Sequence, residues 1–232
     1  QDIEQELKAN ASPDNLQQVQ AALLRMDAMK NAVNVPQHKG TKAHTWLSPK
    51  QVQEITALCD ETLEGKRDYI VLGLLLGAGL RREELSQLTF DALKQQPTKS
   101  GKMRDVLEVV GKGAKSRVIP ISAKLGAHLR EWKDITGGGN VARSLGMKKE
   151  LGESMSAVAI FQLVNKYGAR IGLDALAPHD LRRTYAQLGY EAGIPITQIS
   201  TLLGHSSVST TQRYLNLSLD IEQTASDFIP LA

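Results

Sequence analysis

The sequence contains a single cysteine, Cys59, among 232 residues, so it can form no internal disulfide and no cysteine-rich zinc site. This cysteine usage is typical of a protein kept in a reducing compartment, and we expect a cytoplasmic location. Aromatic residues make up only 4% of the chain, whereas 41% of its residues are hydrophobic. We therefore expect a sizeable core built mainly from aliphatic side chains.

Long apolar runs are also missing, and none approaches the roughly 20 residues that cross a membrane as a helix. We accordingly expect no membrane association. The net charge is only +3, so an acidic partner would have to be bound by a local cluster of Lys and Arg. The first residue is Gln1 and not Met, from which we expect a fragment of a longer protein.

Apolar residues between positions 16 and 33 recur at three- and four-residue steps, which predicts an amphipathic helix. A polar segment with Pro36 and Gly40 follows it. We place a domain boundary there, with residues 1–45 as a helical remnant of a preceding domain plus linker. Residues 46–232 then form the main domain, which ends in an amphipathic helix.

The main domain alternates helical patterns with one short β-rich region. Two β-rich runs, 105–110 and 116–121, flank a glycine-containing connection and predict a hairpin. We interpret residues 135–152 as a loop. A helix capped by Ser48 is predicted to begin at Pro49, and residues 81–88 are predicted to start another. Further helices are predicted over residues 67–77, 122–133, 156–171, 178–191, 196–203, a short stretch from Ser209, and 217–228. The fold class is therefore mostly α with a small antiparallel β-sheet (α+β).

Two of four polar clusters lie at predicted helix starts. Arg81 and Glu84 are three positions apart and share a helix face, either as a surface ion pair or as a phosphate-binding arginine held by a carboxylate. His179 and Arg182 have the same spacing, and both could donate hydrogen bonds to phosphate oxygens. A structural role is the alternative for this pair.

The other two clusters lie at turns. Lys112 and Lys115 occupy the predicted hairpin tip, where they are either solvated or able to reach a nucleic acid. His205 follows a helix-ending glycine, and Tyr214 stands on the next short helix. Tyr214 is either a buried tyrosine with a satisfied hydroxyl or a nucleophile towards phosphorus.

A metal site explains these residues poorly, because His179 and His205 lack close ligand spacing and cysteine partners. The sequence also has no phosphate-binding glycine loop of the Walker type and no paired carboxylates for two-metal catalysis. Arginines, histidines, a lysine and a tyrosine fit metal-free chemistry on a phosphodiester, so we expect neither a metal nor another cofactor.

Four stretches, in order, resemble the tyrosine recombinase (phage integrase) family: G-L-R-R-E-E-L, V-G-K-G-A-K-S-R-V-I-P, P-H-D-L-R and L-G-H-S-S-V-S-T-T-Q-R-Y. The resemblance covers about residues 46–220, the catalytic domain, and implies that residues 1–45 retain part of a core-binding domain. It implies double-stranded DNA as the partner and a homo-oligomer, a tetramer, on that DNA.

The resemblance implies a role for each matching residue. Tyr214 would attack the phosphodiester, form a 3′-phosphotyrosyl link and release a 5′-hydroxyl. Arg81 and Arg182 would hold the scissile phosphate. His179 would act as acid–base or hydrogen-bond donor, and His205 would donate to a phosphate oxygen.

The remaining matches are supporting residues. Lys112 would be the general acid for the leaving 5′-oxygen, with Lys115 as a second candidate. Glu84 would support Arg81. We also expect Lys115 and Arg117 to be DNA contacts.

The resemblance implies a site-specific DNA recombinase or integrase that needs neither metal nor ATP. A type IB topoisomerase-like nicking and closing enzyme would use the same chemistry without a partner protomer. A DNA-binding regulator of the same fold that has lost activity is the second alternative, although every predicted catalytic position is filled.

Overall fold

A computed structural model describes Val19 and residues 46–111, 116–146 and 150–215 of the chain. Apart from Val19, these residues belong to a compact unit that spans residues 44–232. The predicted hairpin tip and the predicted last helix lie outside the described residues, as does the helix predicted over 16–33 except for Val19.

The first helix of the unit, α3 (Pro49–Ala57), begins as its sequence predicts. The Ser48 side chain accepts a hydrogen bond from the Gln51 backbone, and the Gln51 side chain accepts one from the Ser48 backbone. These reciprocal bonds satisfy two backbone donors that the first turn leaves free. The helix start is therefore set by four consecutive residues.

The central helix, α4 (Leu63–Gly77), begins four residues before the apolar run that predicts it. Thr62 is its N-cap and accepts a hydrogen bond from the backbone of Gly65. The first turn is largely charged, so the apolar pattern alone does not mark it. The next helix, α5 (Arg82–Gln87), is short and is followed by a 3₁₀ turn, η1 (Phe90–Ala92).

The sheet is antiparallel with strand order β1-β2-β3. Strands β2 (Met103–Val110) and β3 (Ser116–Pro120) match the predicted hairpin. Strand β1 (Leu93–Pro97) is not predicted by the sequence, because its residues are mostly polar and exposed. It is held by backbone pairing with β2, where the buried Leu107 faces Leu93 on one side and Ile119 on the other.

Five further helices complete the described part: α6 (Ala123–Thr136), α7 (Ala157–Arg170), α8 (Pro178–Glu191), α9 (Ile196–Leu203) and α10 (Val208–Gln212). The predicted fold class, mostly α with a small antiparallel sheet, is confirmed. The predicted loop after α6 is held by backbone hydrogen bonding to the segment after α5 and by a bridge within the loop. The Val141 backbone N–H donates to the Leu88 carbonyl at 2.8 Å, and Leu145 bridges to Leu151.

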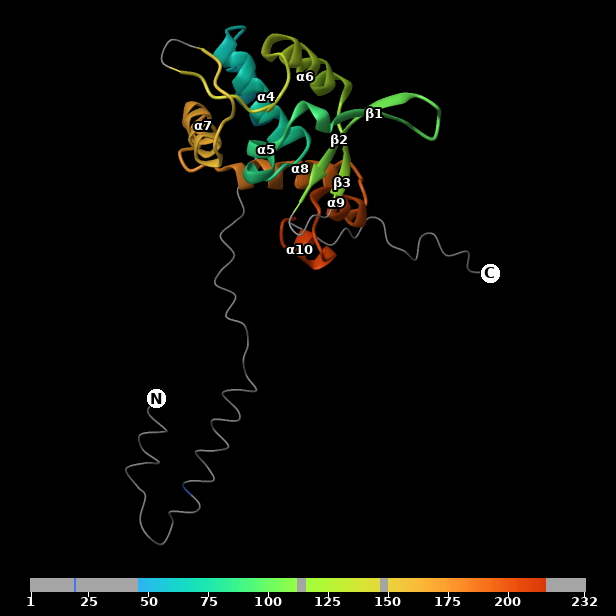
Figure 1. The fold of residues 1–232 in the computed structure, drawn as a ribbon. Coiled ribbons are helices and arrows are strands. Elements are labelled where there is room, and N and C mark those ends of the chain that lie inside the picture. The colour runs from blue at the N-terminus through green and yellow to red at the C-terminus, as the bar shows by residue number, and fades with distance from the viewer. Residues whose placement is uncertain (1–18, 20–45, 112–115, 147–149, 216–232) are drawn as a thin grey trace. The chain divides into compact units, whose positions relative to one another are not determined.

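Helix α4 is the centre of the core and contacts both α6 and α8 (Figure 1). Three of its leucines, Leu72, Leu74 and Leu75, have no exposed surface. Helix α9 in turn lies against β3. This packing brings the loop that follows α4, the start of α8 and the end of α9 to one place, although they are far apart in sequence.

Replacing Leu72 by alanine tests the role of α4 as the core helix. A fully buried leucine truncated to alanine typically loses about 2–5 kcal/mol of unfolding free energy through lost burial and the cavity left behind. The matched control is Val158→Ala on α7, because Val158 is 63% exposed and its change should stay within about 0.5 kcal/mol. Urea unfolding followed by circular dichroism measures both; equal losses would contradict the assignment of Leu72 to the core.

Candidate active site

The buried side chain of Glu84 is the centre of a cluster of ion pairs. Arg81 is the N-cap of α5 and Glu84 its third residue, so Glu84 folds back to accept the Arg81 backbone N–H at 2.9 Å. The other carboxylate oxygen accepts Nη1 of the Arg81 guanidinium at 2.7 Å. The Glu84 side chain is only 7% exposed and that of Arg81 is 36% exposed, so the pair joins a buried carboxylate to a partly exposed guanidinium.

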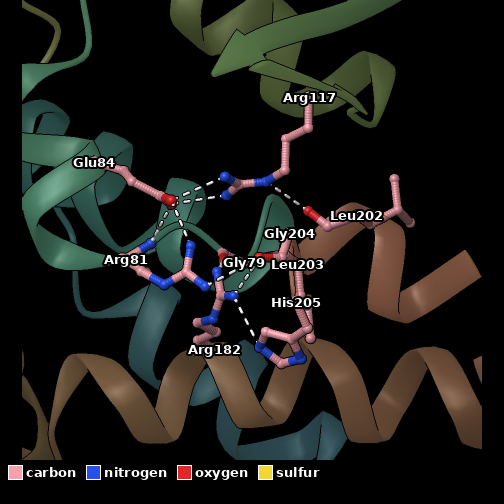
Figure 2. A network of polar contacts seen from close by, with 9 residues as sticks. All are labelled: Gly79, Arg81, Glu84, Arg117, Arg182, Leu202, Leu203, Gly204 and His205. Carbon is pink, nitrogen blue, oxygen red and sulfur yellow. Dashed lines mark hydrogen bonds and ion pairs between the residues drawn. The ribbon is translucent and has the colours of Figure 1, made fainter. Parts of the chain in front are cut away.

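A second arginine, Arg117 on β3, binds the same carboxylate. Its Nη1 and Nη2 donate to the two oxygens of Glu84 at 2.8 and 2.7 Å (Figure 2). Burial by itself would raise the pKa of Glu84, but the hydrogen bonds from Arg117 and Arg81 outweigh it and lower that pKa to about 2. Glu84 is therefore a carboxylate at any physiological pH.

Helix α9 ends at this cluster, and Gly204 follows in the left-handed conformation with φ of 64°. The last carbonyls of a helix have no partner within the helix. Here arginines from three other segments supply donors: Arg117 Nε to Leu202 O at 2.8 Å, Arg182 Nη2 to Leu203 O at 2.5 Å, and Arg81 Nη2 to Gly204 O at 3.4 Å. The three bonds fix the segment that leads directly into His205.

Arg182, on α8, is almost fully buried, with 1% of its surface exposed. Its Nη1 also donates to the carbonyl of Gly79, in the loop after α4, at 2.5 Å. Burial, followed by the positive charge of Arg81, lowers the pKa of Arg182 to about 10. The guanidinium thus remains charged at neutral pH, and its Nε has no hydrogen-bond partner among the described residues.

The hydrogen bonds of His205 determine its tautomer. Nη2 of Arg182 lies 3.2 Å from its Nε2, and an arginine can only donate, so Nε2 accepts. The ring proton is then on Nδ1, which donates to the hydroxyl of Thr211 at 2.8 Å. Burial, followed by the charges of Arg182 and Arg81, lowers the pKa of His205 to about 4, so the ring is neutral at pH 7.

The ring of Tyr214 lies between two imidazoles. Its centroid is 5.0 Å from that of His179 and 4.9 Å from that of His205, both in edge-on geometry. The guanidinium of Arg183 lies 5.5 Å from the same centroid, within the range of a cation–π contact. The backbone N–H of Tyr214 donates to the Thr211 carbonyl at 2.9 Å, so Thr211 holds both His205 and Tyr214.

His179 is the second residue of α8, behind Pro178. Its residue surface is largely open to solvent, but protein covers part of the imidazole. This partial desolvation, followed by the positive charges of Arg183 and Arg182, lowers the pKa of His179. A cleft of about 400 Å³ opens beside it. The lining residues are Leu80, Arg81, Arg82, Glu83, Phe161, Ala177, Pro178, His179 and Arg182.

The structure thus brings six of the predicted site residues into one cluster: Arg81, Glu84, His179, Arg182, His205 and Tyr214. Lys112 and Lys115 lie outside the described residues. Arg117 is present, but its guanidinium is bound by Glu84 and Leu202. No group of histidine, cysteine, aspartate and glutamate suited to a metal occurs within the described ranges.

Two contacts of the cluster have no signal in the sequence analysis. Arg183 follows Arg182 directly, and neighbouring helix positions normally point in different directions. Thr211 is one of several Ser and Thr residues around α10, and only its complete burial distinguishes it.

Among the helices of the described part, none is long and apolar enough to cross a membrane.

Comparisons with known proteins show the family and the fold of the chain. The model of the Phage integrase family matches residues 45–219. A tyrosine recombinase XerC from Pelobacter propionicus is 32% identical over 174 residues, which cover 73% of this chain and 55% of that protein. The chain therefore spans little more than half the length of this curated relative.

Solved structures share the fold at lower identity. The crystal structure of XerA recombinase superposes with a TM-score of 0.62 at 21% identity, covering 75% of this chain and 61% of that one. XerH recombinase bound to a palindromic difH substrate in a post-cleavage complex gives a TM-score of 0.59 at 19% identity, covering 75% and 49%. At these identities the likeness concerns the fold.

The lowered histidine pKa values predict how stability depends on pH. Below pH 6.5 an unfolded chain protonates His179 and His205, whereas the folded chain resists, so the unfolding free energy should fall as the pH drops from 6.5 towards 4. The His205 contribution should level off near pH 4, where the folded ring also takes up its proton. His205→Gln should flatten this part of a denaturant-unfolding pH series, and His128→Gln on α6 is the control; an unchanged slope in His205→Gln would contradict the assignment.

Thr211→Val tests the hydrogen bond from Nδ1 of His205 to the Thr211 hydroxyl. Valine has nearly the shape of threonine but no hydroxyl, so the Nδ1–H of His205 would lose its acceptor at a cost of about 1–2 kcal/mol in unfolding free energy. The Nδ1–H tautomer should persist, because Arg182 still donates to Nε2, but ¹H–¹⁵N NMR of the imidazoles should show faster exchange of the Nδ1 proton with water. Thr211→Ser keeps the hydroxyl and should retain both the unfolding free energy and the NMR behaviour of the Nδ1 proton. A Thr211→Val spectrum like that of the parent would overturn the hydrogen-bond assignment.

Proposed function

This chain belongs to the phage integrase family, and we propose that it is the catalytic part of a site-specific DNA recombinase that cleaves and rejoins strands through Tyr214. One observation carries the proposal. The tyrosine ring lies against two imidazoles in the cluster that also holds Arg182 and Arg81, residues from four separate segments of the chain.

The geometry supports separate roles for these residues around one phosphate. The Tyr214 oxygen attacks phosphorus, the new O–P bond forms, and the bond to the 5′-oxygen of the next nucleotide breaks. The guanidinium groups of Arg81 and Arg182 are charged and held in place, so they stabilise the negative charge that develops on the phosphate oxygens. The phosphotyrosyl bond retains the energy of the broken phosphodiester bond, so rejoining of the strand needs neither ATP nor a metal ion.

Two protons must move in this reaction. The phenol of Tyr214 loses one, and His179 is suited to receive it because its lowered pKa leaves the ring neutral and able to accept. The leaving 5′-oxygen gains one, for which we propose Lys112, with Lys115 as the alternative. His205 would donate to a non-bridging oxygen, which requires its Nε2 to exchange the bond from Arg182 for a proton of its own.

Double-stranded DNA is the proposed partner, in the cytoplasm, with a homo-oligomer, a tetramer, as the active assembly. Support comes from the XerH complex, whose substrate is a palindromic site and therefore has two equivalent halves. A type IB topoisomerase-like reaction would need no second protomer. We assign the catalytic role to residues 46–232 and a DNA-clamping role to residues 1–45.

A nicked suicide duplex tests the proposal, because loss of the short fragment beside the nick traps the covalent intermediate. The duplex carries a site selected from a random library for binding to the 232-residue chain, and the reaction contains EDTA. The parent should form an adduct that survives denaturation, and Tyr214→Phe should lower its formation by roughly 10⁴-fold or more, since the nucleophile is removed. Mass spectrometry should locate the phosphate on Tyr214.

The matched control is Tyr190→Phe, on α8 and exposed, which should leave adduct formation unchanged. An adduct that persists in Tyr214→Phe would show that another residue is the nucleophile. Binding of the selected duplex without any adduct would favour an inactive DNA-binding protein. Relaxation of supercoiled DNA by a monomer, without exchange between two sites, would favour the topoisomerase-like enzyme.

A further inference from the structure

Arg117 combines features that are unusual for a residue expected to contact DNA. It lies on β3, close after the predicted hairpin tip, yet only 8% of its side chain is exposed. Nε, Nη1 and Nη2 all donate hydrogen bonds of 2.7 to 2.8 Å within the protein. A guanidinium bound in this way has little capacity left for a phosphate.

The partners of Arg117 are the groups that hold the cluster on each side. Through Glu84 it is connected to Arg81, because the same two carboxylate oxygens accept the backbone and side chain of Arg81. Through the carbonyl of Leu202 it is connected to the end of α9, three residues before His205. Figure 2 shows Arg117 reaching Glu84 on one side and Leu202 on the other.

The charges explain why a second arginine on Glu84 helps to position Arg81. A carboxylate between two guanidinium groups neutralises one positive charge and keeps the other available. Without Arg117, Glu84 would have Arg81 as its only ion-pair partner among the described residues, and Arg81 would be drawn more tightly to the carboxylate. The Arg117 side chain also packs closely on Gly204, where an added Cβ would lie 3.0 Å from Cδ of Arg117.

We propose that Arg117 is a positioning residue, which aligns Arg81 through Glu84 and His205 through the Leu202 carbonyl, and is not a DNA contact. The inference rests on the proposed function, since the aligned groups are those assigned to the scissile phosphate. It differs from the expectation drawn from the sequence, which placed Arg117 on the DNA because of its position next to the basic hairpin tip.

The two roles make opposite predictions for a lysine in place of Arg117. Lysine keeps the positive charge but cannot bind both carboxylate oxygens and the Leu202 carbonyl at once. A positioning role therefore predicts that Arg117→Lys and Arg117→Ala both slow adduct formation at saturating protein, by roughly 10- to 100-fold. The affinity for the duplex, and its dependence on salt, should stay close to those of the parent.

A DNA contact would behave differently. Arg117→Ala would weaken binding and reduce the slope of log affinity against log salt by about 1, and Arg117→Lys would restore both. This result would overturn the proposal. So would an adduct rate at saturating protein that is unchanged in Arg117→Lys.

Arg130→Ala is the matched control for lost stability. Arg130, on α6, binds the buried Asp105 of β2 at 2.8 Å, so the change also removes an arginine from a buried carboxylate on the same sheet. We expect a comparable fall in melting temperature without a fall in the adduct rate. If both variants slow the reaction equally, Arg117 acts through general stability and the proposal fails.

A readout in the free protein separates this proposal from the proposed function. Arg117→Lys keeps the local charge, so a rise in the NMR titration midpoint of His205 would report that its surroundings have loosened. We expect that rise in Arg117→Lys and not in Arg130→Ala. An unchanged His205 titration would count against the proposal even if the parent formed no adduct, whereas a missing adduct with a shifted His205 would refute the proposed function alone.

Discussion

The buried carboxylate of Glu84 is the interaction on which the site depends. Several guanidinium groups at one place repel each other and are costly to desolvate, so the fold must supply an anion among them. Glu84 is held by two arginines and stays ionised, because their hydrogen bonds more than offset its burial. It leaves the cluster with a net positive charge, which is the property that binding of a phosphodiester requires.

The end of α9 is the second constraint, and it acts on the same arginines. A helix that ends inside a protein leaves carbonyls that must find donors, and here the donors come from α8, β3 and the N-cap of α5. The arginines are therefore structural residues, and under the proposed function Arg81 and Arg182 also bind the phosphate. Each bond that satisfies a carbonyl of α9 also orients a cation next to His205, whose ring in turn contacts Tyr214.

Desolvation divides the titratable groups of the site into two kinds. Burial lowers the pKa of Arg182 to about 10, but the guanidinium stays charged at pH 7 because its ordinary pKa is so high. Burial makes the imidazoles neutral, because their ordinary pKa values lie near neutrality. A site with permanent cations and neutral imidazoles can hold a phosphate and still exchange protons at pH 7, which suits the proposed transfer of a strand to a tyrosine.

Features decided by neighbouring residues could be predicted from the sequence: the Ser48 cap, the start of α8 at Pro178, the glycine that ends α9, and the pairing of β2 with β3. Other features depended on the tertiary structure: strand β1, the contacts of the segment after α6, the tautomer of His205 and the bonds of Arg117. Each requires a partner brought close by the core, and local patterns contain no information on which distant group will be there. The sequence by itself determined which chemical groups the site has, and packing around α4 decided which of them touch.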